Sequence, residues 1–297
     1  IPSSVPIGSD YQIKLIVPDV GGFYSSTFSI NSGGTGASGH SLSFDGVDDY
    51  VGIGSSSNFD VVDELTISAW IKPSQIKEAS IIDRLVDSGN ENTGEGGYRL
   101  NIRSDGEIWA TFGTSCCNDI ANTSTNFYDT HEWVHIAGVF KDANYVKLYI
   151  NGNLIESTNT SRIFNTNNTL EFGRGNWGAN DEYFNGSMDE VTIWNVELTE
   201  SQIQSYMTTS PSGSETGLVG YWNFNEGTGT TLTDQTSSGN DGTIVGAIWS
   251  TDVPSNDNTA PTMTIATTLE ITPEVTTFAG SGSAGSANGT GTAASFD

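Results

Sequence analysis

Short runs in which apolar and polar residues alternate constrain the fold of this chain more than any other feature. In YVKLYI over 145–150, Val146, Leu148 and Ile150 alternate with tyrosine and lysine residues. In LTISAWI over 65–71, every second residue is again apolar. A period of two places successive side chains on opposite faces of a β-strand, so both runs predict strands with one buried face.

Further runs of this kind recur at short spacing, separated by glycine, asparagine and aspartate. The expected strands lie near residues 42–44, 50–53, 65–71, 80–85, 98–102, 108–112, 133–140, 145–150, 169–172 and 188–194. Asn151-Gly152, directly after one of these strands, is a strong hairpin signal. Many short strands joined by such turns predict an all-β sandwich or barrel.

One short helix is expected after the last of these strands. Thr199 and Gln202 have the spacing of a capping box, in which the two residues satisfy each other's backbone donors. Ile203, Tyr206 and Met207 share one helical face. We expect the helix to pack over the end of the sandwich.

The charge balance restricts the partners of the chain. Lysine and arginine total 10 residues against 36 aspartates and glutamates, which gives a formal net charge of −26. Nucleic-acid binding rests on basic side chains that neutralise phosphates, so this class of partner is excluded. An acidic surface attracts cations, calcium above all, although such surfaces are also common in salty extracellular settings without any bound ion.

The sequence also bears on location. It contains no run of about 18 apolar residues, so no insertion into a membrane is expected. The chain opens at Ile1 without a methionine, and we expect a processed chain or an excerpt of a longer one. These features favour a secreted or cell-surface, extracellular protein.

Composition divides the chain into four regions. Residues 1–36 hold terminal strands and a linker, 37–208 form the main strand-rich region, and 209–254 form a further β segment. Two strands alone are marginally stable, so those of 1–36 are expected to need partners from a neighbouring domain or chain. Residues 255–297 are a linker and low-complexity tail, a composition that does not fold in isolation.

Ordered motifs in the main region resemble the laminin-G-like, concanavalin A-like jelly-roll family of bacterial surface proteins. They are LSFDGVDDYVGIG (42–54), LTISAWIKP (65–73), EWVHIAGVF (132–140), KLYINGNLI (147–155) and FNGSMDEVTIWNVELTESQI (184–203). Thr192 replaces the family's usual arginine and Gln202 its usual glutamate. The resemblance implies an antiparallel jelly-roll β-sandwich with flanking β-strand segments.

The flanking regions carry shorter resemblances. Residues 1–36 resemble the last strands of a bacterial Ig-like domain, and 216–254 resemble a companion segment often found beside these domains. The final residues, VTTFAGSGSAGSANGTGTAASFD, resemble the start of an NHL-type β-propeller repeat, that is, of a next domain. Together they imply a piece of a long modular surface protein.

A calcium site is the first candidate site. Asp45, Asp48 and Asp49 cluster in FDGVDD, and Ca²⁺ takes six to eight oxygen ligands, many of them carboxylates. The family commonly carries calcium, and Asp189 matches a position often used for it. If the first and last strands of the jelly roll are neighbours, Asp45 and Asp189 converge. The alternative is that Asp48 and Asp49 only shape the turn through hydrogen bonds to the backbone.

Two adjacent cysteines, Cys116 and Cys117, form the second candidate. Adjacent Cα atoms lie about 3.8 Å apart, whereas ordinary disulfides span about 4.4–6.8 Å. A disulfide between them therefore needs a distorted peptide in a tight turn, which the turn-rich sequence GTSCCNDI allows. The ring would be a rigid apolar knob suited to contact with a sugar; the alternatives are a stiffened loop or two reduced thiols.

Aromatic residues near loops are the third candidate. Trp109 leads into the cysteine loop, and Trp177 lies in GRGNWGANDEYF with Asn180 and Asp181. A tryptophan at the rim of a sandwich can stack on a pyranose while polar neighbours bond to its hydroxyls. A purely structural role for Trp177 is the alternative.

No motif for catalysis is found. His135 lies in a strand motif, which favours a packed histidine, and the E-x-D-x-E spacing of glucan hydrolases does not occur. We therefore expect a non-enzymatic adhesion or carbohydrate-binding module, stabilised by calcium, whose partner is a glycan or glycoprotein. The alternative is a structural subunit of an extracellular fibre or filament, assembled through its terminal strands with copies of the same chain.

Overall fold

The computed structural model describes most of the region between residues 39 and 254 and the backbone of four short N-terminal strands. Within that region the described ranges are 39–60, 63–85, 95–113, 118–122, 131–161, 163–164, 168–175 and 182–254. The N-terminal strands pair as β1 (Gly8–Tyr11) with β4 (Phe28–Ile30) and β2 (Lys14–Val17) with β3 (Gly21–Tyr24). The chain divides into two units, Ile1–Pro261 and Thr262–Asp297, and the second lies wholly outside the described residues.

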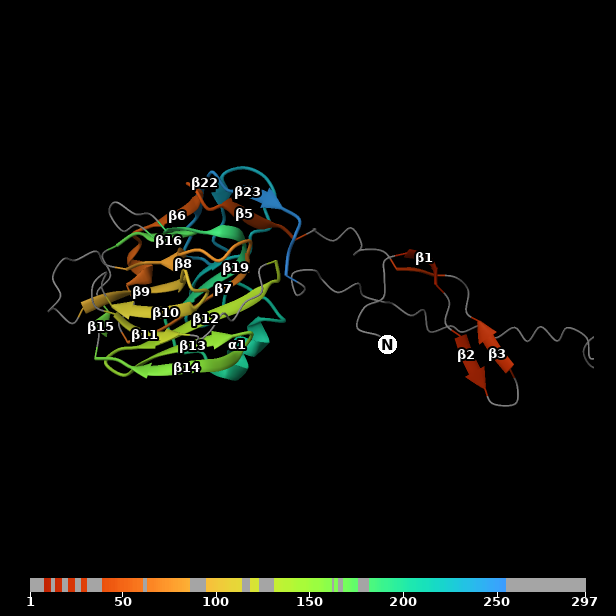
Figure 1. Ribbon diagram of the computed structural model, residues 1–297, viewed down its shortest axis with the longest axis horizontal. Coiled ribbons are helices and arrows are strands. Elements are labelled where there is room, and N and C mark those ends of the chain that lie inside the picture. Colours follow the sequence, from red (N-terminus) through yellow and green to blue (C-terminus); the bar gives the residue numbers. More distant parts are fainter. Residues whose placement is uncertain are drawn as a thin grey trace, which may run out of the picture. The chain divides into compact units, whose positions relative to one another are not determined.

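Two large, mainly antiparallel sheets form the body of the structure (Figure 1). The eight-stranded sheet has the order β14-β13-β12-β7-β19-β5-β23, with β20 paired to β19. Its strands are β5 (Ser41–Asp45), β7 (Glu64–Pro73), β12 (Val134–Lys141), β13 (Tyr145–Ile150), β14 (Asn153–Asn159), β19 (Asn185–Trp194), β20 (Leu218–Trp222) and β23 (Ile248–Ser250).

The nine-stranded sheet has the order β11-β10-β9-β8-β16-β6-β22-β21, with β15 paired in parallel to β9. Its strands are β6 (Tyr50–Gly54), β8 (Ala79–Asp83), β9 (Glu95–Ile102), β10 (Ile108–Gly113), β11 (Asn118–Asn122), β15 (Ile163–Phe164), β16 (Leu170–Phe172), β21 (Thr231–Leu232) and β22 (Gly242–Val245). A short ribbon of β17 (Arg174–Gly175) and β18 (Glu182–Tyr183) packs against β8, and a 3-10 turn, η1, spans Ser57–Phe59.

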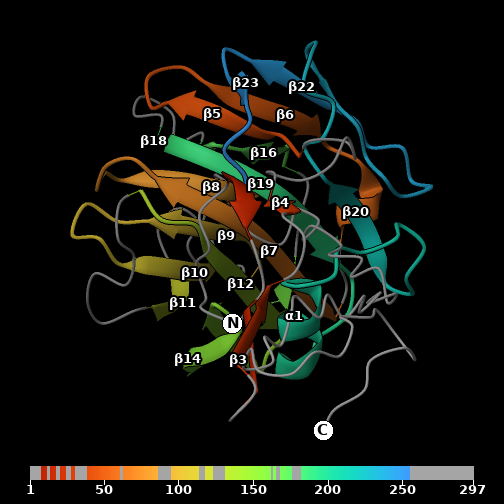
Figure 2. The ribbon, with the colours of Figure 1, turned by 90° about the vertical axis from the view of Figure 1, so that its right-hand side faces the viewer.

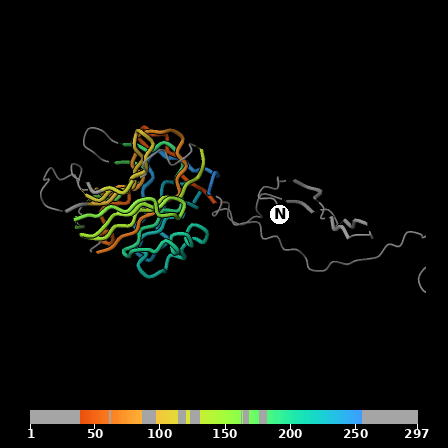
Figure 3. The backbone as a smooth tube through the Cα atoms, turned by 60° about the horizontal axis from the view of Figure 1, so that its bottom comes forward, coloured from red at the N-terminus to blue at the C-terminus, as the bar shows by residue number. Residues whose placement is uncertain are grey.

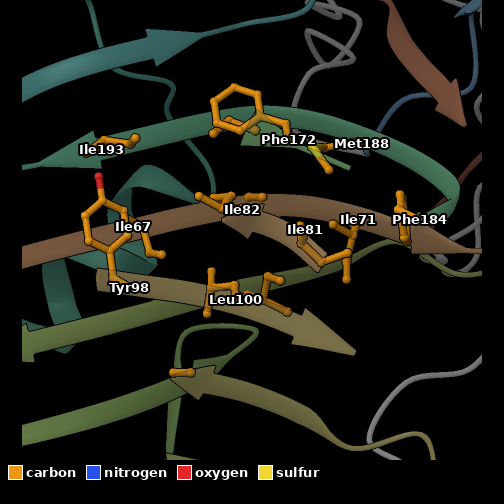
Figure 4. Close-up of a cluster of buried hydrophobic side chains, with 14 of the residues drawn as sticks. Ile67, Ile71, Ile81, Ile82, Tyr98, Leu100, Phe172, Phe184, Met188 and Ile193 are labelled. Atoms are coloured by element: carbon orange, nitrogen blue, oxygen red, sulfur yellow. The ribbon is translucent and has the colours of Figure 1, made fainter. Parts of the chain in front are cut away.

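The main core lies between the two sheets. Figure 4 shows Ile67 and Ile193 from the eight-stranded sheet facing Ile82, Leu100 and other apolar residues of the opposite sheet. Each of these four side chains is completely buried. The alternation read from the sequence therefore corresponds to inward-facing residues, and the predicted all-β sandwich is confirmed.

A second apolar cluster covers the outer face of the eight-stranded sheet. Helix α1 (Glu200–Tyr206) packs there, with Ile203 buried among Ala137, Val139 and Trp194. In Figure 3 the helix lies against the green strands β12 to β14, and Figure 2 shows α1 beside β14. The predicted capping box of Thr199 and Gln202 is present. The helix thus lies on a sheet face, and not over the end of the sandwich as its sequence position suggested.

The segment 209–254 is continuous with the sandwich. β20 pairs with β19, β22 with β6 and β23 with β5, so this segment contributes strands to both sheets. Trp222, Phe224 and Leu232 are completely buried in the main core. The expected companion β segment over 209–254 thus contributes apolar residues to the main core.

Candidate functional site on the nine-stranded sheet

The outer face of the nine-stranded sheet carries buried polar side chains, while its inner face is apolar. Cross-strand partners run from Thr111 on β10 through Arg99 and Asp83 to Glu171 on β16. Asn101 and Ser80 are partners in the neighbouring position. We call this set the polar row; its members, all at most 7% exposed, are Ser80, Asp83, Arg99, Asn101, Thr111 and Glu171.

Arg99 holds the centre of the polar row. Its Nη1 lies 3.0 Å from Glu182 Oε2 and 3.9 Å from Asp83 Oδ2. The Ser80 hydroxyl lies 3.0 Å from the same Asp83 oxygen and 3.4 Å from the same Glu182 oxygen. Burial raises the pKa of the Asp83 carboxyl, and the Arg99 charge opposes this shift. Burial likewise raises the pKa of Glu182, and the Arg99 charge again opposes this shift. One guanidinium therefore stabilises two partly desolvated carboxylates.

Glu171 is neutralised in a similar way at the β16 end of the polar row. Its carboxylate forms a two-point ion pair with Arg174, in which Arg174 Nε lies 2.9 Å from Glu171 Oε2. The Arg174 guanidinium also lies 3.7 Å from the centroid of the Tyr50 ring. A planar guanidinium suits both contacts at once, which fixes the positions of the Glu171 and Tyr50 side chains.

A second set of residues, all partly exposed, surrounds Trp109 at the β10–β11 edge of the nine-stranded sheet. The Trp109 indole N–H donates to Glu107 Oε2 at 2.7 Å, and Asn122 Nδ2 donates to the same oxygen at 2.9 Å. The Arg103 guanidinium lies 4.5 Å from the Trp109 ring and is ion-paired with Glu78. We call these five residues the Trp109 rim. Glu107 fixes the orientation of the indole, and Arg103 covers one of its faces.

Asn101 is the member of the polar row that adjoins the Trp109 rim. Asn101 is the cross-strand partner of Trp109, and its Oδ1 accepts from the Thr111 hydroxyl at 3.3 Å. Its Nδ2 is buried and donates to no group within the described part of the chain. Leaving a buried donor unsatisfied costs about 1–3 kcal/mol, so an acceptor oxygen from water or a ligand would stabilise this position.

The acidic turn between β5 and β6 brings together three of the four predicted calcium ligands. Carboxylate oxygens of Asp45, Asp48 and Asp49 all lie within 4.8 Å of one another. Asp49 Oδ2 accepts from the Asp45 N–H and Asp45 Oδ1 from the Val47 N–H, both at 2.8 Å. Burial raises the pKa of Asp49, and the charges of Asp45 and Asp48 add to this shift. The turn therefore has both the backbone hydrogen bonds of a structural turn and the clustered carboxylates of a cation site.

Asp189 lies elsewhere. The first and last strands of the main region are neighbours, as expected, but the register pairs Asp45 with Asn185. Asp189 is four residues further along β19, opposite Trp70 of β7, and its side chain is fully buried. It adjoins a β-bulge in which Glu190 has a φ of 51° and accepts from the Tyr221 hydroxyl at 2.7 Å. Asp189 therefore does not complete the acidic turn.

The remaining predicted site residues lie outside the described residues. Cys116 and Cys117 belong to the segment between β10 and β11, and Trp177, Asn180 and Asp181 to the segment between β17 and β18. Among the predicted ligand-binding residues, Trp109 lies within the part of the chain that the structure describes. Its side chain is partly exposed on β10. The predicted packed histidine is confirmed, since His135 is 4% exposed.

Sequence reasoning missed the polar row. One usable signal is YRLNI over 98–102, where Arg99 and Asn101 alternate with Tyr98 and Leu100. That pattern predicts a polar outer face on this strand. The ion pairs that join Arg99 to Glu182 and Arg103 to Glu78 link residues 83 and 25 positions apart, and no local pattern indicates them.

Comparison with known families and structures identifies the fold. The sequence profile of a laminin-G family in the concanavalin A-like lectin/glucanases superfamily matches residues 45–204, more than half of the chain. The chain belongs to this superfamily. No curated protein sequence matches it.

Two solved structures illustrate the similarity of fold. The first is from Bacteroides ovatus ATCC 8483 and is provisionally described as a carbohydrate-binding protein; it has a TM-score of 0.57 and 18% identity, over 80% of this chain. The present chain covers 66% of that protein, slightly under two thirds. The second, a heptameric pentraxin of Limulus polyphemus, has a TM-score of 0.51 and 14% identity, over 73% of this chain and 96% of that one. At these identities the likeness concerns the fold alone.

No helix among the described residues is long and apolar enough to cross a membrane.

Proposed function

We propose that this protein is an extracellular carbohydrate-binding module that binds a glycan through the Trp109 rim and the adjoining polar row. The observation that carries the proposal is the contrast between the two outer faces of the sandwich. Helix α1 and its apolar cluster cover the outer face of the eight-stranded sheet. The outer face of the nine-stranded sheet instead carries the partly exposed Trp109 beside a buried polar network. The relatives support it, because one is described as carbohydrate-binding.

The rim has the chemistry that sugar recognition requires. Pyranose rings stack on aromatic faces. Arg103 covers one face of the Trp109 ring, and we propose that a pyranose stacks on the other. The oxygens of Glu107 and the amide of Asn122 can exchange hydrogen bonds with sugar hydroxyls. Glu107 holds the Trp109 indole and the Asn122 amide by hydrogen bonds, so the site is largely preorganised.

Affinity electrophoresis through gels that contain soluble polysaccharides tests the proposal. Trp109→Ala should weaken the retardation of the protein by about tenfold in apparent Kd, equivalent to about 1.4 kcal/mol. Trp249→Ala is the matched control, because Trp249 is also half-buried but lies on β23 of the opposite sheet. Equal retardation of wild type and the Trp109 variant would place the binding site elsewhere.

We propose binding without hydrolysis. Glycoside hydrolysis needs one carboxyl as acid and a second as base or nucleophile. Asp83 and Glu182 are both held by Arg99, and Glu171 by Arg174. Although burial raises the pKa of Asp83 and Glu182, each of these carboxyls is engaged by a guanidinium, so contact with a glycosidic bond would require its ion pair to be broken. Release of reducing ends from a polysaccharide that the protein binds, lost in Glu182→Gln, would contradict this part of the proposal.

We also propose that calcium stabilises the domain at the acidic turn. Asp45 and Asp48 are exposed and, with Asp49, would supply carboxylate oxygens, with water completing the coordination. Calcium should raise the Tm of the wild type but not that of Asp48→Asn. If the turn is only structural, Asp48→Asn should instead raise the Tm without calcium, because it relieves repulsion, and calcium should have no effect on either protein.

A further inference from the structure

We infer that the glycan recognised at the Trp109 rim is a neutral one, without carboxylate or sulfate groups; this inference rests on the proposed function. The starting point is the distribution of charge. The described part of this sheet face presents three guanidinium groups, those of Arg99, Arg103 and Arg174. It also presents five carboxylates, those of Glu78, Asp83, Glu107, Glu171 and Glu182, an excess of two negative charges.

All three of these cations already have a carboxylate partner. Arg99 pairs with Glu182, Arg103 with Glu78, and Arg174 with Glu171. An acidic sugar would have to displace one of these partners and leave a half-buried carboxylate without its cation, which is strongly unfavourable. The net charge of −26 on the whole chain adds long-range repulsion of a polyanion.

The polar groups that remain suit hydroxyls. Glu107 carries no cation among the described contacts; its Oε2 accepts from Trp109 and Asn122. A carboxylate accepts further hydrogen bonds from sugar hydroxyls, for which no charged group on the ligand is needed. The buried Asn101 amide next to Trp109 lacks an acceptor within the described part of the chain, and an uncharged oxygen such as a hydroxyl or ring ether is sufficient to satisfy it.

Affinity electrophoresis with two sets of polysaccharides separates this inference from the proposed function. The neutral set is a β-glucan, a mannan and a xylan, and the acidic set is alginate, polygalacturonate and chondroitin sulfate, each run with calcium and with a chelator. The inference predicts retardation by at least one neutral polymer, lost in Trp109→Ala, and none by the acidic set. Retardation by acidic polymers alone would overturn the inference and leave the proposed function standing. Absence of retardation in every gel would overturn the proposed function and the inference with it.

A charge variant tests the same inference from the opposite direction. Glu78→Gln removes the partner of Arg103 and should create weak, salt-sensitive retardation by polygalacturonate. Glu200→Gln is the matched control, because it makes the same charge change on α1, which covers the opposite sheet. Retardation of wild type by polygalacturonate equal to that of Glu78→Gln would contradict the assignment.

Discussion

At the scale of single residues, burial of His135 couples stability to pH. His135 on β12 packs edge-on against Trp70 of β7, with ring centroids 5.4 Å apart. Burial lowers the pKa of His135 from 6.5 to about 3, because the protein interior does not solvate the imidazolium. Between these values the unfolded chain binds a proton at this position that the folded chain does not. The free energy of unfolding therefore falls as the pH falls through this window.

Replacement of His135 by phenylalanine should remove this dependence. Below pH 6.5 and down to about pH 4, the unfolding free energy of wild type should decline relative to that of His135→Phe by about 1.4 kcal/mol per pH unit. Urea unfolding at several pH values measures the difference between the two curves, so that shared effects of carboxyl titration cancel. Parallel curves would show that His135 is protonated in the folded protein.

At the scale of elements, local sequence patterns predicted most strands and the helix, but not what covers each sheet face. Val146 and Leu148 face the main core as their alternation requires. Thr66 and Ser68 alternate correctly with Ile67, yet they too are buried, because residues 195–221 with helix α1 cover this outer face. Alternation specifies which residues share a face of the strand. Whether that face is exposed to solvent depends on segments more than 100 residues away in sequence. The Val196 carbonyl, for example, accepts a hydrogen bond from the Thr66 hydroxyl.

The cap of α1 is the element-scale prediction. Thr199→Ala removes the side-chain acceptor of the Gln202 N–H and should lower the free energy of unfolding by about 1 kcal/mol. The exposed Thr209→Ala should change it by less than about 0.5 kcal/mol. Chemical denaturation of the two variants measures this difference. An equal effect would mean that tertiary packing alone holds the helix.

At the scale of the whole molecule, the sandwich requires residues that are far apart in sequence. Arg99 forms ion pairs with Asp83 of β8 and with Glu182 of β18. Strand β22, near the end of the described region, pairs with β6, near its beginning. The sequence motifs identified the fold and its strands, whereas the polar face arises from long-range register and could not be derived locally. The Ig-like and propeller resemblances of the flanks, and assembly into a filament, stay predictions.

The strands after residue 208 should be indispensable. A chain covering 37–208 lacks Trp222, Phe224 and Leu232, all fully buried in the main core. It should show no cooperative thermal unfolding, because loss of large core side chains costs about 3–5 kcal/mol each and total stability is about 5–15 kcal/mol. A chain covering 37–254 should unfold cooperatively. A cooperative transition in the shorter chain, followed by circular dichroism, would show that 209–254 is an accessory segment.

Hydrogen–deuterium exchange tests most directly the central claim that a glycan binds on the nine-stranded sheet. The protein is compared free and saturated with the neutral polysaccharide that retards it most. Binding at the Trp109 rim predicts slower exchange in peptides of β9, β10 and β11, and unchanged exchange in α1, β13 and β14 on the opposite sheet. Protection confined to α1 and β12–β14, or to the acidic turn at 45–49, would contradict the placement of the site.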